Sequence, residues 1–229
     1  PDNQINGVDF VLPFRFSEGT WSLGTRGPVT LRIGEVENLV TARNITADLQ
    51  GDYPWTEDNP LLLTNVKVET LGGKITMQQL RMPQHDPALL RVDNISSSEL
   101  ISAVNPKQFA MSGPVSGALP FWLDNEKWII KDGWLTNPGP MTLRIDKDTA
   151  DAIVKDNMVA GAAINWLRYM EISRSWTRIN LDNLGELTMQ ATIKGTSRVD
   201  GKSSSVNLNY THDENVFTLW RSLRFGDNL

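Results

Sequence analysis

The chain has 229 residues, no cysteine and two histidines, and its 27 acidic against 22 basic residues give a formal net charge of -5. This length is enough for one large domain that buries a core of its own. The absence of cysteine excludes zinc fingers, iron–sulfur sites, thiol proteases and disulfide scaffolds. The acidic balance argues against a nucleic-acid-binding protein, which needs a basic face for phosphates.

Alternating apolar residues predict antiparallel β-strands along most of the chain. The first alternating segment covers residues 8–16, and turn signals such as Gly72-Gly73 and residues 137–140 (Asn-Pro-Gly-Pro) separate the later ones. A period of two is typical of strands with one dry and one wet face. The apolar residues of the series are Val8, Phe10, Leu12, Phe14, Phe16, Val29, Leu31, Ile33, Ile45, Ala47, Leu49, Val66, Val68, Ile75, Met77, Met141, Leu143, Ile145, Leu187, Met189, Ala191, Ile193, Val206, Leu208 and Tyr210.

Two helices are predicted inside this series of strands. The first covers residues 97–104, because Ser96 and Glu99 stand at the spacing of a capping box. The second is a long helix over residues 149–172, where apolar residues form one broad side.

A third, amphipathic helix is predicted at the end of the chain, over residues 212–224. Thr211 and Glu214 have capping-box spacing before it. Its apolar residues recur at the helical period, which gives the helix a stripe that could pack on its own sheet or bind a partner. The residues of this stripe are Val216, Leu219, Trp220 and Leu223.

A search for reactive groups finds no catalytic site, metal site or cofactor motif. Gly72-Gly73-Lys74 lacks the remaining residues of a phosphate-binding loop. His85 has Asp86 beside it but no serine placed to complete a triad, and His212 is expected to belong to a helix cap. We therefore predict that the chain is not an enzyme. The eight tryptophans are compatible with packing, sugar stacking or lipid contact.

Residues 108–141 carry a family resemblance. They contain Gly113-Pro-Val-Ser-Gly117-Ala-Leu-Pro, then Ile130-Lys-Asp-Gly-Trp-Leu and Pro138-Gly139. This pattern resembles the repeated motif of AsmA-like proteins, and more closely the C-terminal domain of the YdbH family, catalogued under the label "dicarboxylate transport". The opening segment 12–23 and the closing segment 206–224 are similar to the same domain.

The resemblance implies a fold and a location. The expected fold is mostly β (α+β): a curled antiparallel sheet that forms an elongated, β-taco-like groove, with about three helices in a single domain over residues 1–229. The resemblance also implies the C-terminal piece of a longer protein that is anchored in the inner membrane and crosses the periplasm. A dicarboxylate site would need a cluster of arginines, and the sequence has none that demands one.

The function that the resemblance implies is phospholipid transfer between the inner and outer membranes. A small outer-membrane lipoprotein is the implied partner, joined by strand addition. The alternatives are a periplasmic scaffold or docking domain and a Trp-rich carbohydrate-binding module. A closed β-sandwich would give the same alternation as an open groove, and the sequence leaves both open. The residues expected to line a lipid groove are Val8, Phe10, Leu12, Phe14, Phe16, Leu31, Ile33, Leu143, Ile145, Met189 and Ile193.

Overall fold

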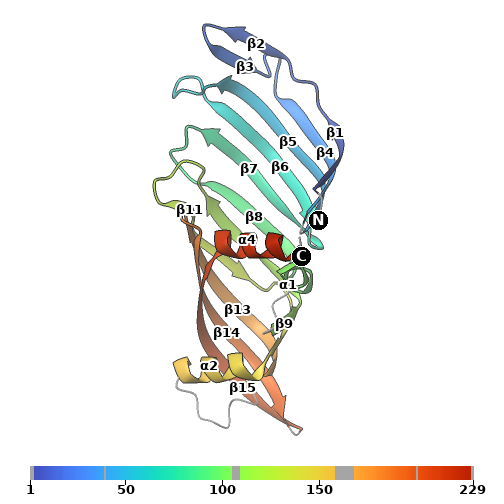
Figure 1. The fold of residues 1–229 in the computed structure, drawn as a ribbon, viewed down its shortest axis with the longest axis vertical. Coiled ribbons are helices and arrows are strands. Elements are labelled where there is room, and N and C mark those ends of the chain that lie inside the picture. Colours follow the sequence, from blue (N-terminus) through green and yellow to red (C-terminus); the bar gives the residue numbers. More distant parts are fainter. Residues whose placement is uncertain (1–2, 39, 105–108, 158–167, 200, 228–229) are drawn as a thin grey trace.

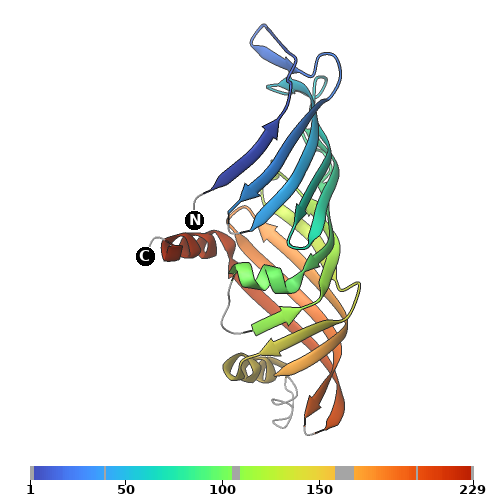
Figure 2. The same cartoon turned by 90° about the vertical axis from the view of Figure 1, so that its right-hand side faces the viewer.

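The alternating segments form one curled antiparallel sheet of 15 strands in a computed structural model that describes residues 3–38, 40–104, 109–157, 168–199 and 201–227. Figure 1 shows the strands stacked along the long axis of the molecule, and Figure 2 shows the three helices on the same side of the sheet. The predicted fold class, mostly β with a curled antiparallel sheet and about three helices, is confirmed, and the described residues contain three helices.

The strands are β1 (Gln4–Asp9), β2 (Phe14–Ser17), β3 (Thr20–Leu23), β4 (Val29–Glu37), β5 (Thr41–Tyr53), β6 (Leu61–Thr70), β7 (Gly73–Met82), β8 (Ala88–Ser96), β9 (Phe109–Ser112), β10 (Pro114–Phe121), β11 (Trp128–Thr136), β12 (Met141–Ile145), β13 (Tyr169–Asp182), β14 (Glu186–Val199) and β15 (Lys202–Asn215). They follow one another across the sheet almost in chain order. β9 and β10 are two parts of one strand, interrupted at Gly113, and they pair with β12 and β11. Among the described residues the sheet does not close, because β1 pairs only with β4 and β15 only with β14.

Left-handed residues inside the strands bend the sheet. Asn44, Asn65, Asn94 and Asp132 have φ between 49° and 55°, a conformation that Asn and Asp adopt more readily than other side chains. The pairing register shifts at all four of these positions. Such bulges bend the strand and increase its twist, so the curl of the sheet follows from residues in the strands themselves.

Asp48 ties three strands together beside one of these residues. Its carboxylate accepts hydrogen bonds from Asn65 Nδ2 at 3.0 Å and from Thr30 Oγ1 at 2.8 Å. These two bonds hold the pKa of Asp48 below its usual value, and the bond from Asn65 has the larger effect. The charged carboxylate thus links β4, β5 and β6 where Asn65 bends the sheet.

Helix α1 (Ser97–Val104) has the predicted bounds, and Ser96 Oγ accepts a hydrogen bond from the Glu99 backbone N–H at 3.3 Å. Helix α2 (Lys147–Asn157) is shorter than the predicted helix over 149–172. Residues 158–167 lie outside the described residues, and Tyr169–Ile172 belongs to β13. The prediction of a long helix was wrong at this end. Buried Met170 and Ile172 alternate with exposed residues, and this period of two is typical of a strand.

Helix α4 (Val216–Asp227) begins later than predicted. Residues 212–215 belong to β15, where His212 pairs with Met189 and Glu214 with Leu187. The predicted cap by Thr211 is therefore wrong. The side chain of Asn215 caps the helix instead, because its Oδ1 accepts a hydrogen bond from the Thr218 backbone N–H at 2.9 Å.

The continuous strand predicted over residues 8–16 is also wrong. β1 ends at Asp9 and β2 begins at Phe14. The chain bends between them, where Pro13 has no N–H to donate and its carbonyl oxygen accepts a hydrogen bond from the Gly24 N–H at 2.8 Å. Gly24 has a φ of +66° and forms the matching break between β3 and β4.

Two clusters of buried apolar side chains lie along the sheet. The first cluster consists of Met77, Leu80, Met82 and Ala88, and the second of Met141, Leu143, Ile145, Ala150, Met170, Ile172, Ile193 and Leu208.

None of the helices in the described ranges is long and apolar enough to span a membrane.

Gly117 offers a test of how closely the strands approach at the family motif. A Cβ at this position would overlap the Trp134 carbonyl oxygen and come within 2.9 Å of Leu135 Cα. We expect Gly117→Ala to lower the free energy of unfolding by about 2–4 kcal/mol, a loss of roughly 5–10 °C in Tm by calorimetry. Gly139→Ala is the control, because its Cβ would meet only Pro114 Cγ at 3.5 Å. Equal Tm values for the two variants would contradict this packing.

Candidate functional site: an apolar lane along the open sheet

One side of the sheet carries apolar residues from strand to strand. Residues directly opposite each other in an antiparallel pair project to the same side, so the pairing registers trace this side across the sheet. Val8 lies opposite Ile33, and Ile33 lies opposite Ile45. Leu31 lies opposite Ala47 on the same side of β4 and β5. We call this row of side chains, followed below from Val8 on β1 to Tyr210 on β15, the apolar lane.

The hairpin of β2 and β3 adds aromatic rings to the lane. Phe16 lies opposite Trp21, which lies opposite Tyr53. The ring centroid of Trp21 is 4.8 Å from that of Phe16 and 5.3 Å from that of Phe14. Tyr53 is four residues after Leu49 on β5, so both side chains are on the same side of that strand.

The middle of the lane is the first buried cluster. Leu49 lies opposite Leu63, and Leu63 lies opposite Leu80. Leu80 packs in one cluster with Met77. The partly buried residues that pack on this cluster are Trp55, Leu61, Leu63, Val66, Leu90 and Phe121.

The lane continues through the segment that carries the family motif. Met77 lies opposite Leu90, and Leu90 lies opposite Leu119. Two residues earlier on β10, Gly117 lies opposite Leu135. The remaining opposite pairs are Leu135 with Thr177, Thr177 with Ala191 and Ala191 with Tyr210.

A cavity of about 310 Å³ opens within the C-terminal part of the lane. Its volume lies at the lower end of the range of small-molecule sites. Helix α1 covers it with Leu100 and Ile101, while β9 to β15 form the wall. The apolar residues of that wall are Phe109, Met111, Val115, Leu135, Met141, Leu143, Ile145, Ile172, Met189, Ala191, Ile193 and Leu208, joined by Tyr210.

Exposure divides the lane into two halves. In the N-terminal half, the side chains of Val8, Phe14 and Phe16 are 53%, 60% and 56% exposed. In the C-terminal half, Leu143 and Ile145 are buried in the cluster that borders the cavity. The apolar lane is thus open to solvent at one end and covered at the other.

The predicted groove residues fall into these two halves. Leu143, Ile145, Met189 and Ile193 line the cavity. The residues on the open half are Val8, Phe14, Phe16, Leu31 and Ile33. Phe10 and Leu12 lie in the link between β1 and β2, where Phe10 borders a separate hollow of about 420 Å³ together with Arg26 and Arg32.

Several lane residues were missed by the sequence analysis. Leu63 stands in a run of three leucines, which gives no sign of the side to which each one projects. Leu135 follows a tryptophan in a strand whose register shifts twice. Leu100 and Ile101 were predicted as helical, but their contact with the cavity follows only from the position of α1 on the sheet.

The histidines lie in hydrogen-bonded pairs rather than in a catalytic arrangement. His85 Nε2 is 2.7 Å from the nearer carboxylate oxygen of Glu57. His212 Nε2 is 3.1 Å from Glu214 Oε2, and its Nδ1 is 3.2 Å from the Tyr210 hydroxyl. Within the described ranges no group of three or more His, Asp or Glu side chains could hold a metal ion.

The predicted partner-binding stripe lies on α4. Val216 and Leu219 are half-buried, Trp220 is 41% exposed, and the side chain of Leu223 lies outside the described residues. Figure 2 shows α4 extending away from the sheet. Part of its apolar surface therefore faces solvent.

The comparisons with known proteins identify the family. The family model "YdbH-like: Intermembrane phospholipid transport protein YdbH" matches residues 1–229. The chain is 81% identical over its whole length to the "Probable phospholipid transport protein YdbH" of Escherichia coli (strain K12), and it spans 26% of that relative. No solved structure matches the chain. On the strength of the whole-length match, the chain belongs to the YdbH-like family of intermembrane phospholipid transport proteins.

Proposed function

We propose that the chain is a lipid-transfer module whose apolar lane shields phospholipid acyl chains from water between the inner and outer membranes. The observation that carries this proposal is the lane itself, traced from Val8 to Tyr210 by pairing register and, between Leu80 and Met77, by their shared buried cluster, and containing an apolar cavity of about 310 Å³. The name of the family and of the Escherichia coli relative supports phospholipid as the cargo.

The energetics of the cargo explain why a lane is sufficient. Each CH₂ group removed from water gains roughly 0.8 kcal/mol. A tail of ~16 carbons therefore costs on the order of 13 kcal/mol when it is exposed to water, which prevents free diffusion across an aqueous gap. A continuous apolar surface removes most of this cost, and movement along it requires no reacting group.

The two halves of the lane have different roles in this proposal. The open half, with exposed rings such as Phe14 and Phe16, gives a tail a surface along which to move. The covered half, beneath Leu100 and Ile101 of α1, encloses a tail on several sides. We infer that a lipid enters or leaves through the open half and rests in the cavity.

The location and the partner are also proposals. We infer that the chain acts in the periplasm as part of a longer protein anchored in the inner membrane, as its similarity to a relative almost four times its length supports. We infer that a small outer-membrane lipoprotein adds a strand to the free edge of β15, beside the exposed side of α4.

A carbohydrate-binding role has less support. Three tryptophans are among the exposed large apolar residues: Trp21, Trp176 and Trp220. Trp21 belongs to the apolar lane and Trp220 to α4. Trp176 is on the other side of the sheet, stacked on Trp134 with ring centroids 4.8 Å apart. One exposed stacked pair is a smaller feature than a lane along the whole sheet, so lipid is the favoured ligand.

Met189→Asp tests the cavity as a lipid site. The half-buried Met189 lines the cavity, whereas its neighbour Gln190 projects from the opposite side of β14. A carboxylate placed among apolar walls is costly to desolvate, so we expect at least a tenfold loss of co-purified phospholipid, measured by mass spectrometry of extracts. Gln190→Asp adds the same charge outside the lane and should keep its lipid. Equal lipid content in the two variants would refute the assignment.

A photo-crosslinking residue at Phe14 tests the open half of the lane. Phe14 is exposed on the apolar side, while Ser22 on the neighbouring strand lies on the opposite side, because it pairs with Arg15. We expect irradiation in cells to label phospholipid from position 14 and not from position 22. Labelling at neither position, or equally at both, would count against movement of lipid along β2 and β3.

A photo-crosslinking residue at Asn207 tests whether the proposed lipoprotein binds at the free edge of β15. Asn207 is exposed on β15, next to the free edge. We expect an adduct with a small lipoprotein, identified by its mass and its acyl chains. Asp58 lies in the loop between β5 and β6, far along the sheet order from β15, and serves as the control. An adduct at position 58 but not at position 207 would place the partner elsewhere.

A further inference from the structure

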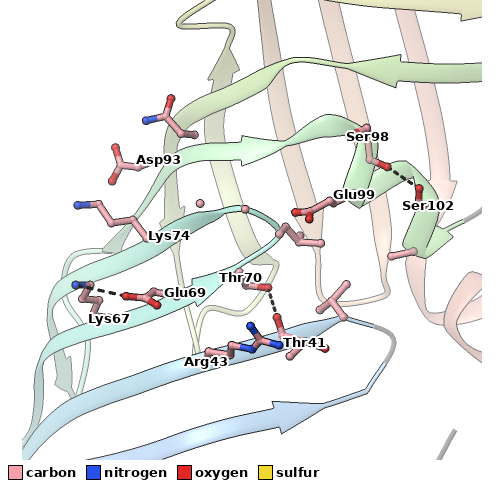
Figure 3. Close-up of a pocket in the computed structure, with 16 residues that line it drawn as sticks. Thr41, Arg43, Lys67, Glu69, Thr70, Lys74, Asp93, Ser98, Glu99 and Ser102 are labelled. Carbon is pink, nitrogen blue, oxygen red and sulfur yellow. Dashed lines mark hydrogen bonds and ion pairs between the residues drawn. The ribbon is translucent and has the colours of Figure 1, made fainter.

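The side of the sheet opposite the apolar lane carries charges of both signs in its N-terminal half. Glu69 lies opposite Lys74, and Lys74 lies opposite Asp93. Because Lys74 is three residues before Met77 of the lane, this row projects away from the lane. Figure 3 shows these side chains at a hollow of about 980 Å³, where Lys67 Nζ is 4.0 Å from Glu69 Oε1. Acidic and basic groups offset one another here.

The C-terminal half of the same side carries cations without carboxylates. Trp176 stands next to Thr177 of the lane and therefore projects to the opposite side. Three rows of directly opposite residues cross β13, β14 and β15 there, and all nine side chains are exposed. We call these nine residues the basic patch. Its rows are Arg174, Lys194 and Asn207; Trp176, Thr192 and Asn209; and Arg178, Gln190 and Thr211.

The charges of the basic patch favour a bound anion. Arg174 lies directly opposite Lys194, and like charges in this position destabilise a sheet. Arg174, Arg178 and Lys194 form no ion pair with any residue of the described ranges. An anion between Arg174 and Lys194 would remove their repulsion. The guanidinium group of arginine offers paired N–H donors that match a carboxylate or a phosphate.

Trp176 adds an aromatic surface to the middle of the basic patch. Its ring is stacked on that of Trp134, with centroids 4.8 Å apart and planes at 9°, and Trp176 is 51% exposed. Such a ring, supported by its neighbour, can contact the apolar face of a sugar. Next to it, Thr192 Oγ1 donates a hydrogen bond to Asn209 Oδ1 at 3.3 Å. The side-chain N–H groups of Asn209 can donate to sugar hydroxyls.

We propose that the basic patch binds an acidic glycan, with a sugar ring on Trp176 and a carboxylate or phosphate of the glycan between Arg174 and Lys194. A membrane surface fits the patch less well. Membrane-bound faces combine cations with apolar side chains that enter the lipid, and the nine residues include no aliphatic apolar side chain. The described helices lie on the lane side of the sheet (Figure 2), so this site is separate from the proposed lipid site.

Calorimetry with oligosaccharides tests the basic patch. A hexasaccharide of alternating glucuronate and N-acetylglucosamine carries carboxylates, pentamannose phosphate carries a phosphate ester, and the N-acetylglucosamine hexamer is uncharged. We expect one of the acidic glycans to bind about tenfold more tightly than the uncharged hexamer, and added salt should reduce this difference. Trp176→Ala should weaken the acidic glycan roughly tenfold. Arg174→Gln combined with Arg178→Gln should abolish the preference for the acidic glycan.

The controls change the same residue types elsewhere. Trp220→Ala removes an exposed ring from α4, and Arg15→Gln combined with Arg32→Gln removes two exposed charges from the N-terminal half. Both should bind the acidic glycan as the unchanged chain does. Circular dichroism shows whether each variant is folded, and if Trp176→Ala is not, the arginine variant decides alone.

Several results would overturn this inference. The basic patch is not the site if its variants bind the acidic glycan like their controls. The patch does not recognise an acidic glycan if neither acidic oligosaccharide binds, or if the uncharged hexamer binds as tightly as they do. Vesicles of phosphatidylglycerol are the last probe. If they bind through Arg174 and Arg178 while no glycan binds, the patch is a membrane contact instead.

Discussion

The structure depends on one constraint: its single sheet has one apolar side and two free edges. All 15 strands belong to that one sheet, so its apolar side has no second sheet to pack against within the described ranges. Exposed apolar surface of this extent marks a binding surface. The helices cover only a part of it, and Phe14 and Phe16 remain more than half exposed. In the proposed function, a cargo with long apolar chains is the ligand of this surface.

The curl of the sheet turns that surface into a lane. Left-handed Asn44, Asn65, Asn94 and Asp132 lie where the register shifts within their strands, and each shift increases the local twist. Glycines allow close contact where the lane passes through the family motif, as Gly117 does beside Trp134. The motif therefore acts through backbone geometry, and in the proposed function the transport of lipid follows from shape and hydration.

Much of the fold is predictable because alternation is a local signal. The alternation at 29–33, 141–145 and 187–193 falls on strands β4, β12 and β14, and the capping pair before α1 fixes the start of that helix. The prediction fails where tertiary pairing overrides a local pattern. Residues 212–215 have the composition of a helix start, but they extend β15 because β14 offers them partners.

The candidate site was only partly predictable. Alternation shows that Leu143 and Met189 point to a dry side, but it does not show whether a second layer fills that side. The cavity depends on where α1 rests, which is a long-range contact without a sequence period.

Native mass spectrometry of the chain, purified from cells without detergent, tests the central claim most directly. The account predicts a population heavier than the bare chain by the mass of one intact phospholipid, which is released on collisional activation. A single species at the mass of the bare chain, unchanged after incubation with phospholipid vesicles, would contradict it.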